Sequence, residues 1–278
     1  MATSRSGELH AVAARIAAAL PAEVVEVVLT GSVSRGVADE LSDIEMLFVT
    51  TERLALTECF ELARAVGLEN LDSWGPQGTE VSRVFGYFEQ VPIELIWWPR
   101  GFAEASIASL LAGEPSAAAD ALANGLSFRT VGLLAAWQDA LASYSPELAA
   151  GQIEEAALTW GGFHPSGFLT LTRPGDRLAL VERLLDDASR VLRIVYALNR
   201  VWRPTSKRLL DRVHALPLKP ERLAERIDEA LMEPDPSLAM LAMSRLQLDT
   251  LALAPAGPNV SRARGWLKEV VEVLSRTE

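Results

Sequence analysis

Two acidic side chains stand one residue apart at the start of an apolar stretch. Asp43 and Glu45 open the segment DIEMLFVT at 43–50. Side chains alternate along a strand, so both carboxylates would point to one face and Ile44 to the other. Two carboxylates on one face repel each other unless a cation lies between them. With no His or Cys nearby, these oxygen ligands favour Mg²⁺ or Mn²⁺ over zinc.

The residues just before the acids offer groups that bind phosphate. Gly31 and Ser32 directly follow the apolar segment 23–30, and Arg35 belongs to the same loop. Glycine permits close backbone approach, and a serine hydroxyl can lie beside N–H groups that bind anions. Mg²⁺ usually completes its coordination shell with water and substrate phosphates. The two halves together indicate a metal–phosphate site; the alternative is a turn beside a solvated acidic patch.

A third acid lies in a later apolar segment. Glu94 is flanked by apolar residues in VPIELIWW at 91–98. Pro92 just before it indicates an edge strand or a strand start. The alternative is that Glu94 faces solvent in a hairpin. Glu89 is a weaker candidate for the third acid, because we expect it in the turn.

Composition and charge exclude several classes of protein. The chain has 278 residues, of which 49% are hydrophobic, enough for one large domain or two smaller ones. One cysteine and three widely spaced histidines exclude a disulfide framework and a zinc site. A net charge of −11 disfavours binding to long nucleic acid. Residues 1–20 are amphipathic and no apolar run reaches membrane length, so we expect a cytoplasmic protein.

The pattern of the chain changes near residue 100. Before it, strands are expected at 23–30 and 43–50, and a hairpin is expected from 81–90 and 91–99, with 71–80 as a loop. After residue 101 no further strand is expected. Helices are expected at 7–20, 52–66, 102–124 (with a break at 113–115), 130–143, 147–159, 176–202, 206–214, 220–232, 236–253 and 259–276. The fold class is therefore an N-terminal α/β domain at 1–105, with a small mixed or antiparallel sheet, and a C-terminal all-α helical bundle at 106–278.

The motif around the acids resembles that of a known superfamily. The order G-S-x-x-R-G at 31–36 and S-D-I-E at 42–45 resembles the signature of the DNA polymerase β-like nucleotidyltransferases. Within that superfamily, SDIEM is similar to the kanamycin (aminoglycoside) nucleotidyltransferases, some of which carry Glu as the second acid. The resemblance covers residues 25–50. It implies a catalytic metal site at Asp43, Glu45 and Glu94, and nucleotide binding by Gly31, Ser32 and Arg35.

A second resemblance lies in the helical part. The segment YALNRVWRPTSKRLL at 196–210 is similar to the A-L-N…P…K-W segment that follows the catalytic domain in many bacterial nucleotidyltransferases. It implies that Asn199 and Lys207 reach the nucleotide triphosphate, with Arg203 as a helper. The chain departs from the pattern at Arg208, where an aromatic residue is common. The alternative is a core Asn with satisfied hydrogen bonds and a surface Lys.

The resemblance implies transfer of an NMP, with ATP as the expected donor, to a hydroxyl of a small acceptor such as an aminoglycoside-like antibiotic. Mg²⁺ or Mn²⁺ is the implied cofactor, and a homodimer is compatible with the superfamily. Two other functions stay open: nucleotidylation of a protein or of tRNA, and nucleotide binding by a regulator without turnover. Trp97, Trp98 and Trp160 either stack on the acceptor or belong to the core. The acids at 182–187 either face a cationic acceptor or form a solvated helix face.

Overall fold

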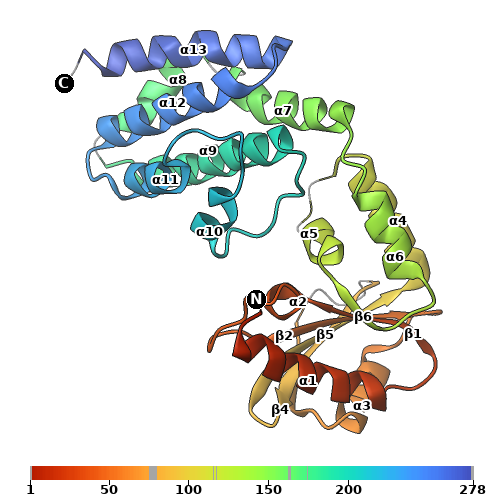
Figure 1. The fold of residues 1–278 in the computed structure, drawn as a ribbon. Helices are drawn as coiled ribbons and strands as arrows, with labels where there is room; N and C mark the ends of the chain where they lie inside the picture. Colours follow the sequence, from red (N-terminus) through yellow and green to blue (C-terminus); the bar gives the residue numbers. More distant parts are fainter. Residues whose placement is uncertain are drawn as a thin grey trace. The chain divides into compact units, whose positions relative to one another are not determined.

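The apolar segments of the N-terminal part form one mixed sheet (Figure 1). The computed structural model describes residues 2–74, 80–114, 116, 118–161, 164–173 and 175–276. The sheet contains β1 (Val24–Thr30), β2 (Ile44–Thr50), β3 (Glu69–Ser73), β4 (Ser82–Phe88), β5 (Val91–Pro99) and β6 (Leu126–Arg129), in the order β3-β4-β5-β2-β1-β6. β2 and β5 are parallel, and every other neighbouring pair is antiparallel. The predicted mixed sheet is confirmed.

The hairpin predicted from 81–90 and 91–99 is present as β4 and β5. Its turn consists of Glu89 and Gln90, whose φ angles are 49° and 69°. Two residues with positive φ are typical of the tight turns that match the twist of a hairpin. Pro92 lies near the start of β5, so the prediction of a strand start is the one that holds. The prediction of an edge strand is wrong, because β5 is a central strand between β4 and β2.

Two strands, β3 and β6, were not predicted from the sequence. β3 includes the first three residues of the predicted loop 71–80, so that part of the prediction is wrong, and the residues of β3 are exposed or half-buried. Residues 75–79 of the predicted loop lie outside the described residues. β6 is four residues long and pairs with β1, so the prediction of no strand after residue 101 is wrong. Short strands with little buried surface leave a weak hydrophobic pattern in the sequence.

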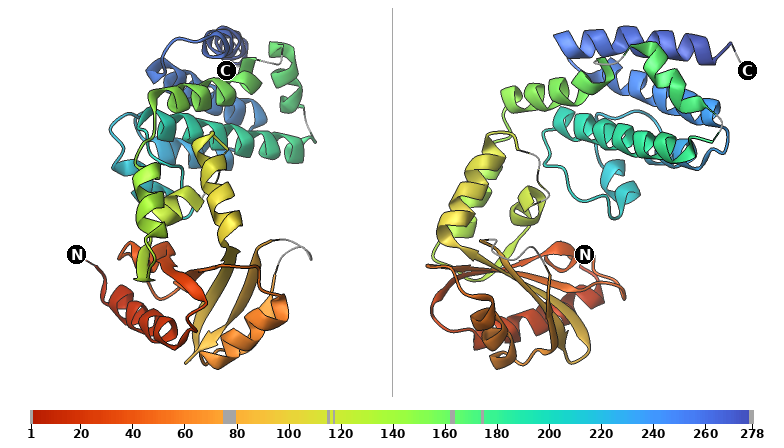
Figure 2. Two further views of the ribbon diagram at one scale, coloured as in Figure 1. Left: turned by 90° about the vertical axis from the view of Figure 1, so that its right-hand side faces the viewer. Right: turned by 180° about the vertical axis from the view of Figure 1, so that it is seen from behind.

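Helices cover both faces of the sheet (Figures 1 and 2). On one face, α1 (Ser4–Ala19) and α3 (Leu56–Ala65) share a core with the apolar side chains of the strands. On the other face, α4 (Arg100–Leu111) contacts β2 and α6 (Leu133–Leu141) contacts β1, while α5 (Ala118–Ala123) contacts α6. The one-turn helix α2 (Gly31–Ser34) directly follows β1.

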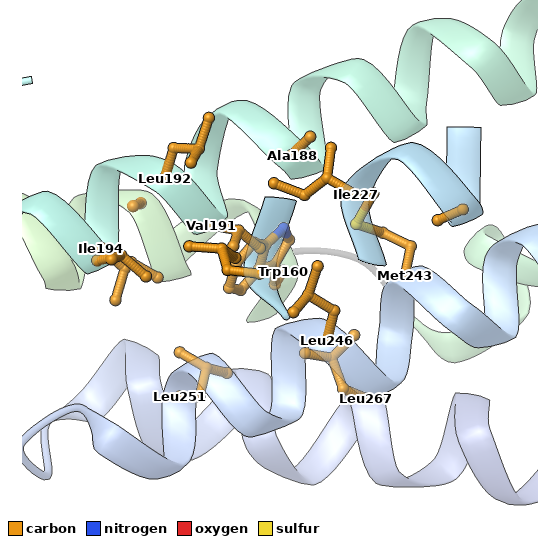
Figure 3. Close-up of a cluster of buried hydrophobic side chains, with 14 of the residues drawn as sticks. Trp160, Ala188, Val191, Leu192, Ile194, Ile227, Met243, Leu246, Leu251 and Leu267 are labelled. Atoms are coloured by element: carbon orange, nitrogen blue, oxygen red, sulfur yellow. The ribbon is translucent and has the colours of Figure 1, made fainter. Parts of the chain in front are cut away.

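The second part of the chain is helical, as predicted. Its elements are α7 (Pro146–Gly161), α8 (Pro165–Leu169), the 3₁₀ turn Thr170–Thr172, α9 (Arg177–Leu198), α10 (Leu209–His214), α11 (Leu223–Met232), α12 (Pro236–Leu253) and α13 (Pro258–Leu274). Trp160 is fully buried among side chains from α9, α11, α12 and α13 (Figure 3). Among the described residues, no helix combines the length and the hydropathy that crossing a bilayer would need.

The chain divides into two compact units, Met1–Ser143 and Tyr144–Glu278. This division lies later in the chain than the predicted boundary between 1–105 and 106–278. The physical reason is β6, since a cut after residue 105 would separate this strand from the sheet that it completes. The bounds of the predicted catalytic and helical domains stay a prediction.

Candidate functional site

The alternation that the sequence predicted for β2 is present. Ile44, Met46 and Phe48 are fully buried in the core beneath the sheet. Glu45 lies between them in sequence, so it points to the opposite face, where it is half-buried. The strand therefore keeps its apolar side chains in the core and presents one carboxylate on the other face.

Asp43 sits at the mouth of β2, after a tight turn. In that turn, the Asp39 carboxylate accepts hydrogen bonds from the Leu41 N–H at 3.1 Å and from the Ser42 hydroxyl at 2.9 Å. The Ser42 hydroxyl in turn accepts a hydrogen bond from the Asp39 N–H. The turn fixes the backbone that enters the strand. Within the described part of the chain, the half-buried Asp43 carboxylate has no hydrogen bond or ion pair.

The strand register brings the second and third acids together. Glu45 of β2 pairs with Glu94 of β5, and Thr30 of β1 pairs with Glu45. Neighbouring strands lie about 4.8 Å apart, and residues paired in register point to the same face. Glu94 is therefore the neighbour of Glu45 on that face, with its side chain 15% exposed. Two acids from separate segments meet here, although the sequence alone left Glu94 between two interpretations.

Gly31 lies against the Glu45 carboxylate. Its φ is +73°, and a β-carbon at this position would lie 2.5 Å from Glu45 Oε2. A side chain here would displace the Glu45 carboxylate, and the positive φ favours glycine as well. The glycine of the sequence motif thus lets the backbone approach an acid of the same motif.

The other two residues of the predicted phosphate loop differ in their surroundings. Ser32 is half-buried, and its hydroxyl makes no hydrogen bond to any residue that the structure describes. Arg35 forms an ion pair with Asp120 of α5, with 3.0 Å between Nη1 and Oδ2. Arg35 therefore links α2 to α5, a role that the sequence did not predict.

Asn199 ends α9 with its side-chain amide fully engaged. Its Nδ2 donates to the Val195 carbonyl at 2.7 Å and to the Leu218 carbonyl at 2.8 Å, and its Oδ1 accepts from the Leu218 N–H at 3.0 Å. This matches the alternative of an Asn whose hydrogen bonds are satisfied by its own unit. A contact with nucleotide stays a prediction.

The two cations near Asn199 have different environments. Arg203 donates to the carbonyl and the hydroxyl of Ser189 on α9, and burial lowers the pKa of its guanidinium. Lys207 is exposed in the turn before α10, as the surface-Lys alternative requires. Its predicted contact with phosphate also stays a prediction.

Three of the candidates for acceptor binding are buried, and the other three, Trp98, Glu182 and Asp186, are not. Trp97 and Trp160 are 2% and 0% exposed, so both belong to hydrophobic cores, whereas Trp98 is half-buried and contacts Phe102. Asp187 is fully buried, and its carboxylate accepts hydrogen bonds from Trp160 Nε1 and Arg183 Nε. An acceptor-facing role for these buried residues is therefore wrong.

Glu89 is confirmed in the turn, away from the acidic pair. Its carboxylate pairs with Arg15 of α1 at 2.9 Å. The hydrogen bond and the charge of Arg15 lower the pKa of this carboxyl. Glu89 therefore lies in the turn with Arg15 as its partner, whereas Glu94 lies beside Glu45 in the register of β2 and β5.

One residue near the acids had not been singled out from the sequence. Arg83 of β4 lies 3.5 Å from Glu94, measured from Nη1 to Oε1, and its guanidinium lies over the ring of Trp74. Phe85 is the register partner of Glu94, and Arg83 lies two residues before it on β4. The sequence alone does not give this register, so it could not identify Arg83.

The donor set fits a hard divalent cation. Glu45 and Glu94 are neighbours in register, and Asp43 directly precedes β2. Among the described residues, no group of three or more His, Cys, Asp or Glu side chains is already gathered closely enough to hold a metal. Mg²⁺ commonly binds one or two carboxylates and takes its other ligands from water and phosphates. A pair of carboxylates without His or Cys suits such a cation better than zinc.

Comparisons with known proteins add little to this description. No protein-family model matches the chain, and no curated protein matches it either. Among solved structures, a nucleotidyltransferase-like protein from Exiguobacterium sibiricum is similar, with a TM-score of 0.42 and 9% identity over 99% of this chain and 92% of that chain.

Proposed function

We propose that the protein is a metal-dependent nucleotidyltransferase that moves an NMP, most simply AMP from ATP, to a hydroxyl of a small acceptor. The observation that carries the proposal is the pair Glu45–Glu94, in register on two parallel strands, with Gly31 against the Glu45 carboxylate. The resemblance at 31–45, with Glu94 as the third acid that it implies, supports the same choice of residues. Nucleotidyl transfer needs carboxylates that hold a cation, because a cation neutralises the charge of the triphosphate and of the departing pyrophosphate.

The carboxylates would divide the work. Asp43 and Glu45 would hold Mg²⁺, and Glu94 would complete the site on the acceptor side. The metal would supply charge neutralisation for the phosphates. Glu94 would also take the proton of the attacking hydroxyl, directly or through water. The acceptor oxygen then forms a bond to the α-phosphorus, the α–β phosphoanhydride bond breaks, and pyrophosphate leaves with the electron pair.

The remaining residues would bind the donor. The backbone at Gly31 and the hydroxyl of Ser32 would contact the terminal phosphates. Lys207 would neutralise charge on the departing pyrophosphate. Arg35 and Asn199 would act by positioning, because Arg35 pairs with Asp120 and the Asn199 amide is engaged with backbone.

The acceptor is proposed as a small hydroxylated molecule because the net charge of −11 disfavours a polyanion such as tRNA. An aminoglycoside-like acceptor is the finer form of this proposal, since a polycation would be attracted to an acidic protein. If the assay showed transfer to protein instead, the acceptor would be a protein side chain.

The experiment measures pyrophosphate release from Mg²⁺-ATP with a panel of hydroxylated acceptors. We expect release by the wild type and a loss of at least about a hundredfold in Asp43→Asn, since one charged ligand of a metal site is removed. Calorimetric titration of Mg²⁺-ATP would show metal-dependent binding by the wild type and much weaker binding by the variant.

Glu52→Gln is the matched control, because this exposed acid follows the other end of β2. It should leave both readouts unchanged. An Asp43→Asn variant that keeps half of the wild-type rate would contradict the role of Asp43. Binding of ATP without release for any acceptor would favour a nucleotide-binding regulator, and label transfer to protein would favour a protein-modifying enzyme.

A further inference from the structure

We propose that Arg83 is a displaceable counter-ion of Glu94: it holds the Glu94 carboxylate until a divalent cation binds, and then rests on the Trp74 ring. This inference rests on the proposed function, because it concerns the metal that Glu45 and Glu94 would share. It adds a positioning residue that neither motif contains.

The register of the sheet places Arg83 beside the acidic pair. Phe85 of β4 pairs with Glu94 of β5, so Phe85 and Glu94 lie on the same face. Arg83 lies two residues earlier on β4 and therefore shares this face. Its Nη1 lies 3.5 Å from Glu94 Oε1. A protein cation thus approaches the third acid from the side opposite to Glu45.

Trp74 lies on the other side of Arg83. Ser73 of β3 pairs with Val84, so Trp74 comes next to Arg83 at the end of the antiparallel pair. The Arg83 Cζ lies 5.9 Å from the centre of the Trp74 ring, and Trp74 is 71% exposed. A guanidinium over an indole face is attracted by the ring quadrupole.

Neither partner holds Arg83 tightly. Charge-assisted hydrogen bonds to carboxylates are typically about 2.7–2.9 Å long, and cation–π contacts reach about 6 Å. Both contacts of Arg83 lie at the long end, and its side chain is 41% exposed. In the same unit, Arg35 lies at 3.0 Å from Asp120 and is 22% exposed. A small rotation would therefore move the Arg83 guanidinium from one partner to the other.

The charge balance gives this movement a purpose. Glu45 and Glu94 on adjacent strands repel each other without a cation. Arg83 supplies one positive charge in the absence of metal. A divalent cation at the pair repels the guanidinium and takes over the carboxylate oxygens, and Trp74 provides a place for the displaced side chain.

The test measures Mn²⁺ binding to the full chain by electron paramagnetic resonance, without nucleotide, so that the readout is independent of catalysis. Removing the competing cation in Arg83→Met should tighten binding by about two- to fivefold, the range expected for an exposed ion pair. Arg83→Lys, which keeps the charge, should bind like the wild type. Trp74→Ala should weaken binding by roughly twofold, since the displaced cation loses its platform.

The double variant separates the parts of the proposal. If Trp74 acts only through Arg83, then Trp74→Ala/Arg83→Met should bind Mn²⁺ as Arg83→Met does. Arg15→Met is the matched control, because Arg15 pairs with Glu89 at 2.9 Å and lies 4.8 Å from the centre of the Phe88 ring. It removes the same charge and the same two kinds of contact, but from α1 on the core face, and should leave Mn²⁺ affinity unchanged.

The contrary outcomes are distinct. Equal Mn²⁺ affinity in the wild type and in a folded Arg83→Met variant would overturn the counter-ion role and leave the carboxylate site standing. A weakening by Trp74→Ala that persists in the double variant would overturn the role of the indole. Mn²⁺ binding that survives Glu45→Gln/Glu94→Gln would overturn both this inference and the proposed metal site.

Discussion

Gly31 and Glu45 are in direct contact, although they lie in separate elements. The sequence placed a flexible residue after one strand and an acid at the start of the next. In the structure the two strands are antiparallel neighbours, and the Glu45 carboxylate occupies the space that a β-carbon of residue 31 would need. The positive φ therefore favours glycine, and the absence of a β-carbon leaves the Glu45 carboxylate in its place.

These two reasons can be separated by experiment. Gly31→Ala should lower the free energy of unfolding by about 2–4 kcal/mol, since it combines backbone strain with a collision against Glu45. Gly132→Ala is the control: its φ is +93°, but nothing lies within 4 Å of the added carbon. It should cost only about 1–2 kcal/mol. Urea unfolding measures both, and equal losses would show that the contact with Glu45 has no weight.

Glu26 shows how a buried acid can be purely structural. It is fully buried in β1, yet its carboxylate accepts hydrogen bonds from the Ser127 and Thr130 hydroxyls and from the Val131 and Leu133 N–H groups. The acid thereby joins β6 and the start of α6 to the sheet. By contrast, Asp43 has no such partner among the described residues, which is why Asp43 and not Glu26 is the candidate ligand.

At the level of elements, the position of β5 decides the site. The pairing of β5 with β2, in parallel and in this register, brings Glu94 beside Glu45. Pro92 is compatible with this position because it is the second residue of β5 and precedes the ladder with β2, which begins at Ile93.

One buried acid, Asp187, links helices α7 and α9 in the helical unit. Asp187 of α9 links Trp160 of α7 to Arg183, which is only 14% exposed. Asp187→Ala should lower the free energy of unfolding of this unit by about 3–5 kcal/mol, because it leaves a nearly buried guanidinium without its carboxylate. The loss would be read from urea unfolding followed by far-UV circular dichroism.

The neighbouring residue provides the comparison. Asp186 pairs with Arg190 at the same i,i+4 spacing, but its side chain is 45% exposed. Asp186→Ala should change the free energy of unfolding by no more than about 1 kcal/mol. If both variants lost the same stability, burial would not be the cause.

At the scale of the whole molecule, each of the two compact units has a hydrophobic core of its own. One core lies between 9 and 97 around the sheet, and the other lies between 153 and 274 among the helices. Because each compact unit buries its own apolar side chains, we expect each to unfold as its own cooperative transition.

The single cysteine reports on the first of these transitions. Cys59 is fully buried in the sheet core, and burial raises the pKa of its thiol to about 11. At pH 8 the native thiol should therefore resist alkylation, and labelling should begin only when the first unit unfolds in urea. The reactive thiolate fraction of the native state should rise only as the pH approaches this raised pKa.

Combining Cys59 labelling with Asp187→Ala tests the independence of the two units. The variant should shift the transition of the helical unit and leave the urea dependence of labelling, measured by mass spectrometry, where it is in the wild type. A parallel shift of the labelling curve would show that the units unfold together.

Local patterns determined much of this protein. Alternation fixed which side of β2 carries Glu45, and helical periodicity located most helices to within a few residues, since both depend on neighbours in the chain. The order of motifs also singled out Gly31, Asp43 and Glu45. These features need only local geometry, and the sequence contains all of it.

Only the tertiary structure decided which distant segments meet. It placed Glu94 beside Glu45, Arg83 beside Glu94, and β6 beside β1. It also gave three polar side chains partners from other segments: Leu218 for Asn199, Asp120 for Arg35, and Trp160 for Asp187. Strand register and side-chain pairing between remote segments depend on how whole surfaces fit together. No local window of sequence carries that fit, so the neighbours of each acid became visible only in the folded chain.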